Sequence, residues 1–95
     1  MILLSEVART DIKSAYVYLN TESPKAARQL LNSIDIAFSM LMEFPNIGHE
    51  RSDLTSYEVK FYSVQKYLIV YKAKTHAHIE IVRFLHGYQD LVSLL

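Results

Sequence analysis

The chain has 95 residues, of which 51% are hydrophobic, and this size and composition predict one globular domain over residues 1–95. Ten Lys and Arg residues balance ten Asp and Glu residues, so the net charge gives no general attraction to nucleic acid, and we expect no direct sequence-specific binding to it. The absence of cysteine excludes disulfides, cysteine-based zinc sites and a thiol nucleophile. Without a recognisable secretory leader or a run of about 18 apolar residues, we expect a cytoplasmic protein that does not span a membrane.

A short strand and a helix are predicted first. Ile2 to Leu4 is an apolar run of strand length. Ser5 follows as a candidate N-cap, and Glu6 lies in the first helical turn, where the helix dipole favours a carboxylate. Asn20-Thr21-Glu22 interrupts the helical pattern and predicts the end of this helix. The apolar stripe of the helix consists of Ala8, Ile12, Ala15, Tyr16 and Leu19.

The second helix has clear start and stop signals. Ser23 is a candidate cap, and Pro24 stands at the first helical position, where its missing N–H costs nothing. The helix should end at Phe44-Pro45, because proline disfavours helical geometry in the residue before it. Since the link is so short, the two helices should form an antiparallel hairpin. Ile36 and Met40 lie opposite the main apolar stripe, so they either contact another chain or are simply exposed.

After a loop at Asn46-Ile47-Gly48, the periodicity changes from that of a helix to that of a strand. Apolar residues alternate from Tyr57 to Tyr62, which predicts a strand. The segment from Tyr67 to Ala73 is more uniformly apolar, as a central strand would be. A turn at Thr75-His76-Ala77 then separates it from a strand that runs from His78 to Leu85.

This order of elements, β-α-α-β-β-β, places the chain in the α+β class. We expect a helical hairpin packed on one face of a mostly antiparallel sheet, with the other face, or an end of the sheet, left available. Asp90 is a candidate cap for a last short helical turn through Leu95.

Polar side chains around the end of the last strand form the best candidate site. A groove with Arg and Lys can bind a phosphate or a carboxylate-rich peptide. His86 can act as an acid or a base near neutral pH. The same side chains can equally be ordinary charges on a sheet surface. The candidates are Arg51, Lys60, Lys66, Arg83 and His86.

Strand alternation does not decide which sheet face carries Arg83. Both faces of the last strand carry apolar residues, so the alternation does not identify which face is exposed to solvent. Alternation groups Arg83 with Ile79, Ile81 and Leu85, and His86 with Val82 and Phe84.

Other kinds of site find little support. His76, His78 and Glu80 would share one strand face and can hold a metal, but the spacing is unspecific, so we predict no metal site. Two isolated glycines cannot make a nucleotide-binding loop, and no motif marks a nucleophilic serine. We therefore expect no cofactor.

Five short motifs follow one another along nearly the whole chain. They are Ala8-x-x-Asp11-Ile12, Ser23-Pro24-x-Ala26-Ala27, Phe44-Pro45-x-x-Gly48-x-x-Arg51, Val64-x-x-Tyr67-Leu68-Ile69-x-Tyr71 and Ile81-x-Arg83-x-Leu85-His86-Gly87-x-x-Asp90. In this order and at these distances, they resemble the ParE branch of the RelE/ParE superfamily, the toxins of bacterial type II toxin–antitoxin pairs. Lys60, Lys66 and Gln89 depart from the pattern, because many ParE relatives have Arg there.

The resemblance implies the β-α-α-β-β-β fold and a cognate ParD-like antitoxin that wraps the toxin. ParE-type toxins are associated with DNA gyrase, which they poison. RelE-type toxins instead cut messenger RNA on the ribosome, a reaction that needs a base, an acid and cations around the phosphate. The resemblance leaves open whether the toxin self-associates or forms a hetero-oligomer with its antitoxin.

Three hypotheses therefore stand. The first is a binding protein that inhibits gyrase without chemistry of its own, using Arg51, Lys60, Lys66, Arg83 and His86 as target contacts, with Ile36 and Met40 reserved for the antitoxin or for self-association. The second is a ribosome-dependent endoribonuclease with Arg51, Lys60, Arg83 and His86 at the phosphate. The third is a decayed toxin that only binds its antitoxin.

Overall fold

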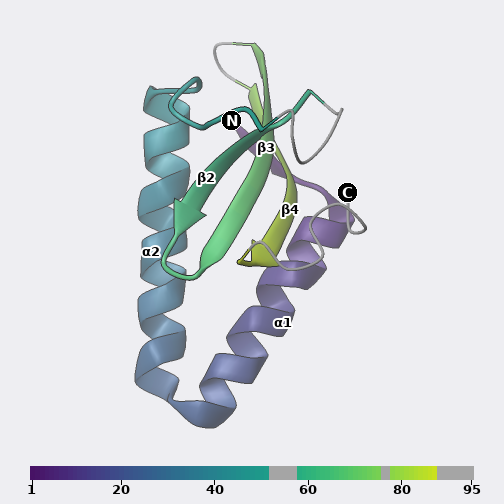
Figure 1. Ribbon diagram of the computed structural model, residues 1–95. Coiled ribbons are helices and arrows are strands. Elements are labelled where there is room, and N and C mark those ends of the chain that lie inside the picture. Colours follow the sequence, from purple (N-terminus) through teal and green to yellow (C-terminus); the bar gives the residue numbers. More distant parts are fainter. Residues whose placement is uncertain (52–57, 76–77, 88–95) are drawn as a thin grey trace.

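The computed structural model of the protein describes residues 1–51, 58–75 and 78–87. Within this part, a strand and two helices precede three further strands (Figure 1). The elements are β1 (Ile2–Leu4), α1 (Glu6–Glu22), α2 (Pro24–Glu43), β2 (Lys60–Val64), β3 (Tyr67–Thr75) and β4 (His78–His86). The predicted order and the α+β class are confirmed. The turn predicted at Thr75-His76-Ala77 and the helical turn predicted after Asp90 rest on residues outside the described ones, apart from Thr75, which ends β3.

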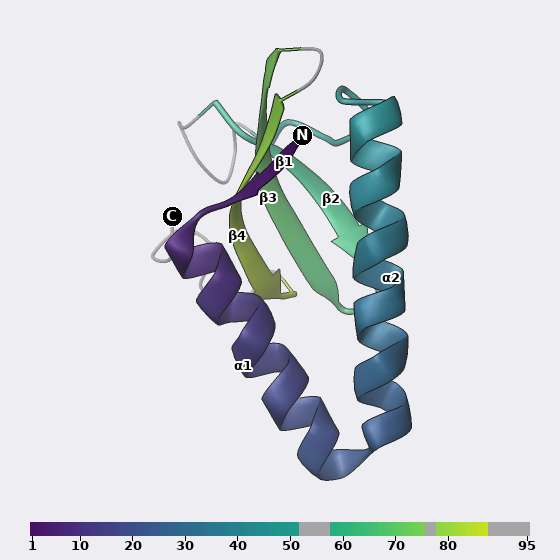
Figure 2. The same ribbon diagram turned by 180° about the vertical axis from the view of Figure 1, so that it is seen from behind.

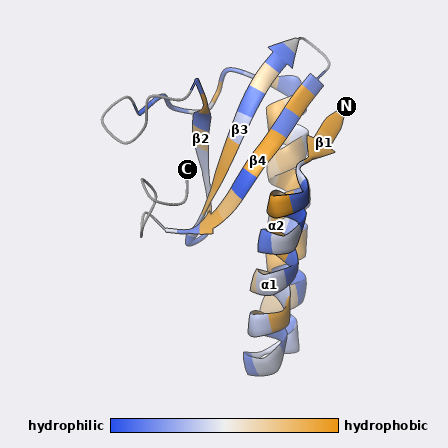
Figure 3. Ribbon diagram, turned by 90° about the vertical axis from the view of Figure 1, so that its right-hand side faces the viewer, coloured by the Kyte–Doolittle hydropathy of each residue, from blue (hydrophilic) through white to orange (hydrophobic). Residues whose placement is uncertain are grey.

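The four strands form one sheet in the order β1-β4-β3-β2. β2, β3 and β4 are antiparallel neighbours, whereas β1 pairs in parallel with β4. Seen from the side, both helices lie on one face of the sheet (Figure 3). From behind, α1 runs down beside β4 and α2 stands beside β2, and the helices meet at the end away from β1 (Figure 2).

The helix boundaries follow from local hydrogen bonds. Ser5 Oγ accepts from the Ala8 N–H at 2.9 Å, and Ser23 Oγ accepts from the Ala26 N–H at 3.2 Å, so both predicted caps are confirmed. Ser23 also closes α1, since its N–H donates to Leu19 O at 2.7 Å. The break predicted at Asn20-Thr21-Glu22 is wrong, because α1 continues to Glu22. The Thr21 hydroxyl donates back to Tyr18 O within the last turn.

Both faces of the sheet carry buried residues, so the first of the two expected alternatives, an available second face, is wrong, whereas the second, an available end of the sheet, is not contradicted. One core cluster joins the helices to the sheet and contains Ala8, Leu30, Ile34, Ala37, Leu41, Val64, Ile69, Tyr71, Ile79, Ile81 and Phe84. A second cluster contains Val59, Phe61, Leu68, Val70 and Leu85, with Val82 packed against it. The physical reason is visible in β3, where consecutive apolar residues serve opposite faces, as expected of a central strand.

A β-bulge in β4 changes which face each side chain serves. Val70 pairs with Arg83, but the next residue, Tyr71, pairs with Ile81, so Val82 is an extra residue in β4. Ile81 therefore belongs to the cluster under the helices, whereas Leu85 belongs to the second cluster. The alternation that grouped these two residues is wrong, because the bulge resets the period of two.

Tyr71 ties the loop after α2 to the sheet. Its side chain is fully buried, and its hydroxyl donates to Pro45 O at 2.8 Å and accepts from the Gly48 N–H at 2.9 Å. Burial raises the pKa of Tyr71 above 10.0, the Gly48 hydrogen bond opposes that shift, and the charge on Tyr62 adds to it. The native state therefore holds this hydroxyl protonated in the range where the unfolded chain ionises.

Alkaline pH should consequently destabilise the fold. Above about pH 10 the unfolded state binds fewer protons than the native state, so the free energy of unfolding falls as the pH rises. We expect Tyr71→Phe to make this fall shallower, and to cost about 1–2 kcal/mol at neutral pH because two polar backbone groups lose their partner. Urea unfolding at a series of pH values measures both effects. Tyr16→Phe, on the flank of α1, is the control, and an unchanged alkaline slope in Tyr71→Phe would contradict the assignment.

Candidate functional site

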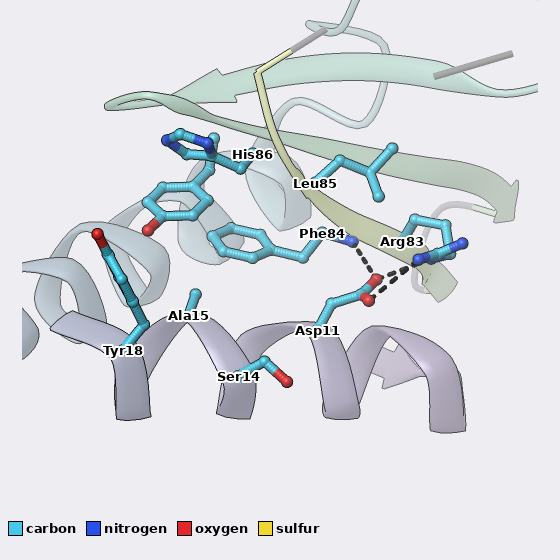
Figure 4. Close-up of a pocket in the computed structure, with 9 residues that line it drawn as sticks. Asp11, Ser14, Ala15, Tyr18, Arg83, Phe84, Leu85 and His86 are labelled. Atoms are coloured by element: carbon cyan, nitrogen blue, oxygen red, sulfur yellow. Dashed lines mark hydrogen bonds and ion pairs between the residues drawn. The ribbon is translucent and has the colours of Figure 1, made fainter. Parts of the chain in front are cut away.

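A groove of about 490 Å³ separates α1 from β4 (Figure 4). α1 contributes polar and small side chains to one wall, and the end of β4 forms the other, together with Tyr67 from β3. The lining residues are Asp11, Ser14, Ala15, Tyr18, Tyr67, Arg83, Phe84, Leu85 and His86. Two of the five candidate target-binding residues, Arg83 and His86, therefore share one groove.

The groove exists because β1 is shorter than β4. Parallel pairing ends at Leu4 and Ile81, and the chain then turns into α1. Ser5 satisfies the next groups on the edge of β4, since its N–H donates to Ile81 O at 3.0 Å and its hydroxyl donates to Val82 O at 2.8 Å. Beyond this point the edge of β4 faces α1 instead of a strand.

Asp11 then links α1 to β4 (Figure 4). Its carboxylate accepts from Arg83 Nε at 2.8 Å, from Arg83 Nη2 at 3.1 Å and from the Phe84 backbone N–H at 3.0 Å. Both side chains are largely buried, with 18% of Arg83 and 16% of Asp11 exposed. The hydrogen bond to Asp11 raises the pKa of Arg83, against the lowering effect of burial. Arg83 is thus held as a permanent cation by a two-point contact.

Aromatic rings form the other half of the groove. The ring of Tyr67 stacks on Phe84 with centroids 4.9 Å apart, and the ring of His86 lies 5.1 Å from Tyr67 at 59°. Burial raises the pKa of Tyr67, and the neighbouring phenol of Tyr18 adds to this effect. Gly87, which follows β4, has a φ of 69°, a conformation that favours glycine. Apolar walls with polar atoms at the rim suit an apolar side chain of a protein partner.

The remaining cations lie elsewhere. Lys66 is at the same end of the sheet, since its carbonyl oxygen approaches Gly87, but its side chain does not line the groove. Lys60 binds Glu50 at 3.2 Å and pairs with Tyr71, whereas His86 pairs with Tyr67, about 13 Å further along β3. Arg51 is partly buried just after the bridge between His49 and Phe61. The structure therefore does not gather the five candidates around one point.

The three candidate metal ligands, His76, His78 and Glu80, do not form a described cluster. His76 lies outside the described residues, and the Glu80 carboxylate is 3.2 Å from Lys74 Nζ. Among residues 1–51, 58–75 and 78–87, no three His, Cys, Asp or Glu side chains come close enough to hold a metal ion. In the same ranges, neither helix is long and apolar enough to cross a membrane.

Sequence reasoning missed three residues of the groove. Asp11 and Tyr67 were part of quoted motifs but had no assigned role, and Tyr18 was not singled out at all. Asp11 did leave a signal, because it is an acid beside the apolar Ile12 on a helix that packs on the sheet. A buried acid requires a partner, and Arg83 was available.

Comparisons with known proteins agree with this geometry. A family model described as the ParE toxin of the type II toxin–antitoxin system parDE matches residues 2–91. A solved structure from the chromosomal ParDE toxin–antitoxin system of P. aeruginosa superposes with a TM-score of 0.72 at 17% sequence identity, over 90% of this chain and 94% of that chain. At this identity the likeness concerns the fold. Comparison with curated protein sequences finds no match.

Proposed function

The chain belongs to the ParE toxin family of type II toxin–antitoxin systems, and we propose that it acts in the cytoplasm by binding and inhibiting DNA gyrase. A ParD-like antitoxin neutralises it. In this proposal the α1–β4 groove, lined by Arg83 and His86, is the surface that contacts the target, and Lys66 lies outside it at the same end of the sheet. The protein contributes contacts and no chemistry of its own.

The state of Arg83 is the observation that favours binding over catalysis. Cleavage of RNA needs cations that converge on one phosphate, together with an acid and a base. Arg83 instead forms a two-point contact with Asp11, and Lys60 binds Glu50. Of the four residues that a ribonuclease would use, only Arg83 and His86 line the groove. An aromatic groove with few available charges supports recognition of a protein surface.

A gyrase supercoiling and cleavage assay with the purified protein tests this proposal. We expect loss of supercoiling or trapped double-strand breaks. His86→Ala should raise the half-inhibitory concentration about tenfold, because it removes an exposed ring from the wall of the groove. Lys74→Ala is the control, since Lys74 is an exposed cation paired with Glu80 at the opposite end of β3.

The same variants separate the ribonuclease alternative. If the folded protein leaves gyrase active even in large excess, but cuts messenger RNA on ribosomes, and His86→Ala abolishes the cut, the gyrase proposal is wrong. If growth arrest persists unchanged when both Arg83 and His86 are substituted, the ribonuclease alternative is wrong. Absence of growth arrest with the wild-type chain would favour a decayed toxin.

A further inference from the structure

The outer face of α2, opposite its buried stripe, carries a line of exposed side chains. The positions are separated alternately by four and three residues, the spacing at which positions recur along one side of a helix that packs against another helix. None of them lines the α1–β4 groove. We call this line the α2 seam, and it consists of Lys25, Gln29, Asn32, Ile36, Ser39 and Glu43.

The α2 seam is symmetric about the level of Ile34. If a two-fold axis crosses the helix there, the α2 helices of two copies run antiparallel, and each seam position faces another seam position. Ile36, which is 57% exposed, then lies beside the axis, so the two copies of this side chain can exclude water from each other. The facing pairs are Lys25 with Glu43, Gln29 with Ser39, and Asn32 with Ile36.

The charges at the two ends of the α2 seam weaken α2 as a single helix. Lys25 stands in the first turn and Glu43 in the last, and the helix dipole disfavours both placements. In an antiparallel pair, each Lys25 lies beside Glu43 and the negative helix end of the other copy, so the same charges attract. Within residues 1–51, 58–75 and 78–87, neither Lys25 nor Glu43 forms an ion pair in its own chain.

Glu43 also has neighbours at the N-terminus. It lines a hollow with Ile2, Asp35 and Met42, and the Met1 ammonium is 3.3 Å from Met42 Sδ. The Glu43 side chain is nevertheless exposed. Lys25 and Ile36 do not line this hollow, so a change at either of them acts on the α2 seam without touching the N-terminus.

The outer face of α1 fits the same axis. Both helices lie on one face of the sheet, so their outer faces point away from it together (Figure 3). Ile12 and Ile34 are each 11 residues from Ser23, which links the helices, so an axis level with Ile34 is also level with Ile12. Val7 and Val17 are placed symmetrically about that level, and each is 51% exposed. The axis therefore turns Val7 of one copy toward Val17 of the other.

We propose that a second copy of this chain binds the α2 seam, so that two molecules pair through antiparallel α2 helices. The charges of this partner are known, because they are those of the chain itself. A contact made mainly by one pair of helices is small, so we expect a reversible dimer with a Kd on the order of 10–100 µM. Neither the gyrase target nor the antitoxin enters this inference.

Sedimentation equilibrium of the purified full chain, from about 5 to 500 µM, measures this dimer. Ile36→Lys replaces the apolar contact beside the axis with a cation that faces its own copy, and we expect at least roughly tenfold weaker association. Ile47→Lys is the matched control, since Ile47 is an exposed isoleucine in the loop after α2, outside the seam. It should leave the Kd within about twofold of the wild-type value.

The end charges allow a reversal and a rescue. Lys25→Glu places two carboxylates at each end of the seam, and we expect about threefold to tenfold weaker association at low salt and a smaller loss at high salt. Glu43→Lys places two cations there and should cause a similar loss. The chain with both substitutions again has opposite charges, so its Kd should return to within about twofold of the wild-type value. Lys66→Glu, at an exposed lysine outside the seam, should change nothing.

Thermal unfolding of the dilute proteins separates weaker association from weaker folding. Each single charge reversal suits the helix dipole, so neither should lower the Tm. A wild-type chain that stays monomeric up to about 500 µM would overturn the inference, and so would a dimer that Ile36→Lys and Lys25→Glu leave unchanged. If the double substitution fails to restore the dimer, Lys25 does not face Glu43, and the antiparallel α2 pairing is wrong.

Discussion

Replacing Asp11 with alanine is expected to lower the free energy of unfolding by about 3 kcal/mol. The substitution leaves the Arg83 guanidinium, only 18% exposed, without its carboxylate and removes the acceptor of the Phe84 N–H. A cation that loses its two-point carboxylate contact and a backbone donor that loses its acceptor, both largely buried, each cost about 1–3 kcal/mol or more. For a domain of this size, about 3 kcal/mol corresponds to a fall in Tm of roughly 12–24 °C.

Two further variants separate the charge from the backbone contact. Asp11→Asn keeps an oxygen that can accept from the Phe84 N–H, so it should recover part of the loss. Arg83→Met in the Asp11→Ala background should also recover stability, because the largely buried position then holds no charge that has lost its carboxylate. Asp35→Ala, on an exposed position of α2, should change stability by no more than about 0.5 kcal/mol. If Asp11→Ala melts at the wild-type temperature, the link between α1 and β4 does not stabilise the fold.

Replacing Gly48 with alanine is expected to destabilise the fold by about 3 kcal/mol as well. A Cβ atom at this position would lie 2.6 Å from Tyr71 Oη, 2.7 Å from Tyr71 Cε1 and 3.0 Å from Phe61 O. Tyr71 is fully buried in the core and Phe61 O is a backbone atom of β2, so neither can move away easily. The glycine is required for space, because the loop closes directly onto the tyrosine ring.

A double-mutant cycle with Tyr71→Phe tests this explanation. The phenylalanine removes the hydroxyl contact but keeps the ring carbon, so the two losses should be less than additive. Asn46→Ala changes an exposed residue of the same loop and should cost no more than about 0.5 kcal/mol. Chemical denaturation measures all four proteins. Full additivity in the cycle would contradict the steric account.

These two expectations give a physical meaning to two of the sequence motifs. Asp11, in the first motif, links α1 to β4 through its contact with Arg83. Gly48, in the third motif, leaves room for the loop after α2 to pack against Tyr71, whose hydroxyl accepts from the Gly48 N–H. The first contact orients Arg83 beside the groove, and the second fixes the turn that presents Phe44 and Ile47. Both motifs therefore stabilise the fold and shape a surface at the same time.

The sequence by itself determined the order of the elements and most of their ends. Ser5, Ser23 and Pro24 act on backbone groups within about one helical turn, so their effect is readable without the fold. Apolar runs and alternation likewise identified the strands, because both are local properties of the chain, although the strand predicted from Tyr57 to Tyr62 begins at Lys60 and ends at Val64. The one helix end that was misplaced is that of α1, which continues through Asn20 and Thr21 to Glu22.

Only the tertiary structure decided the composition of the candidate site. Asp11 and Arg83 are 72 residues apart in the chain, and the bulge at Val82 depends on pairing with β3. Arg83 and His86 line one groove, whereas Lys60 binds Glu50. The spacing of these residues in the sequence does not indicate which of them lie together. Such contacts depend on where β1 ends and on how α1 packs against β4. They are set by packing across the whole domain, whereas capping and alternation act between near neighbours.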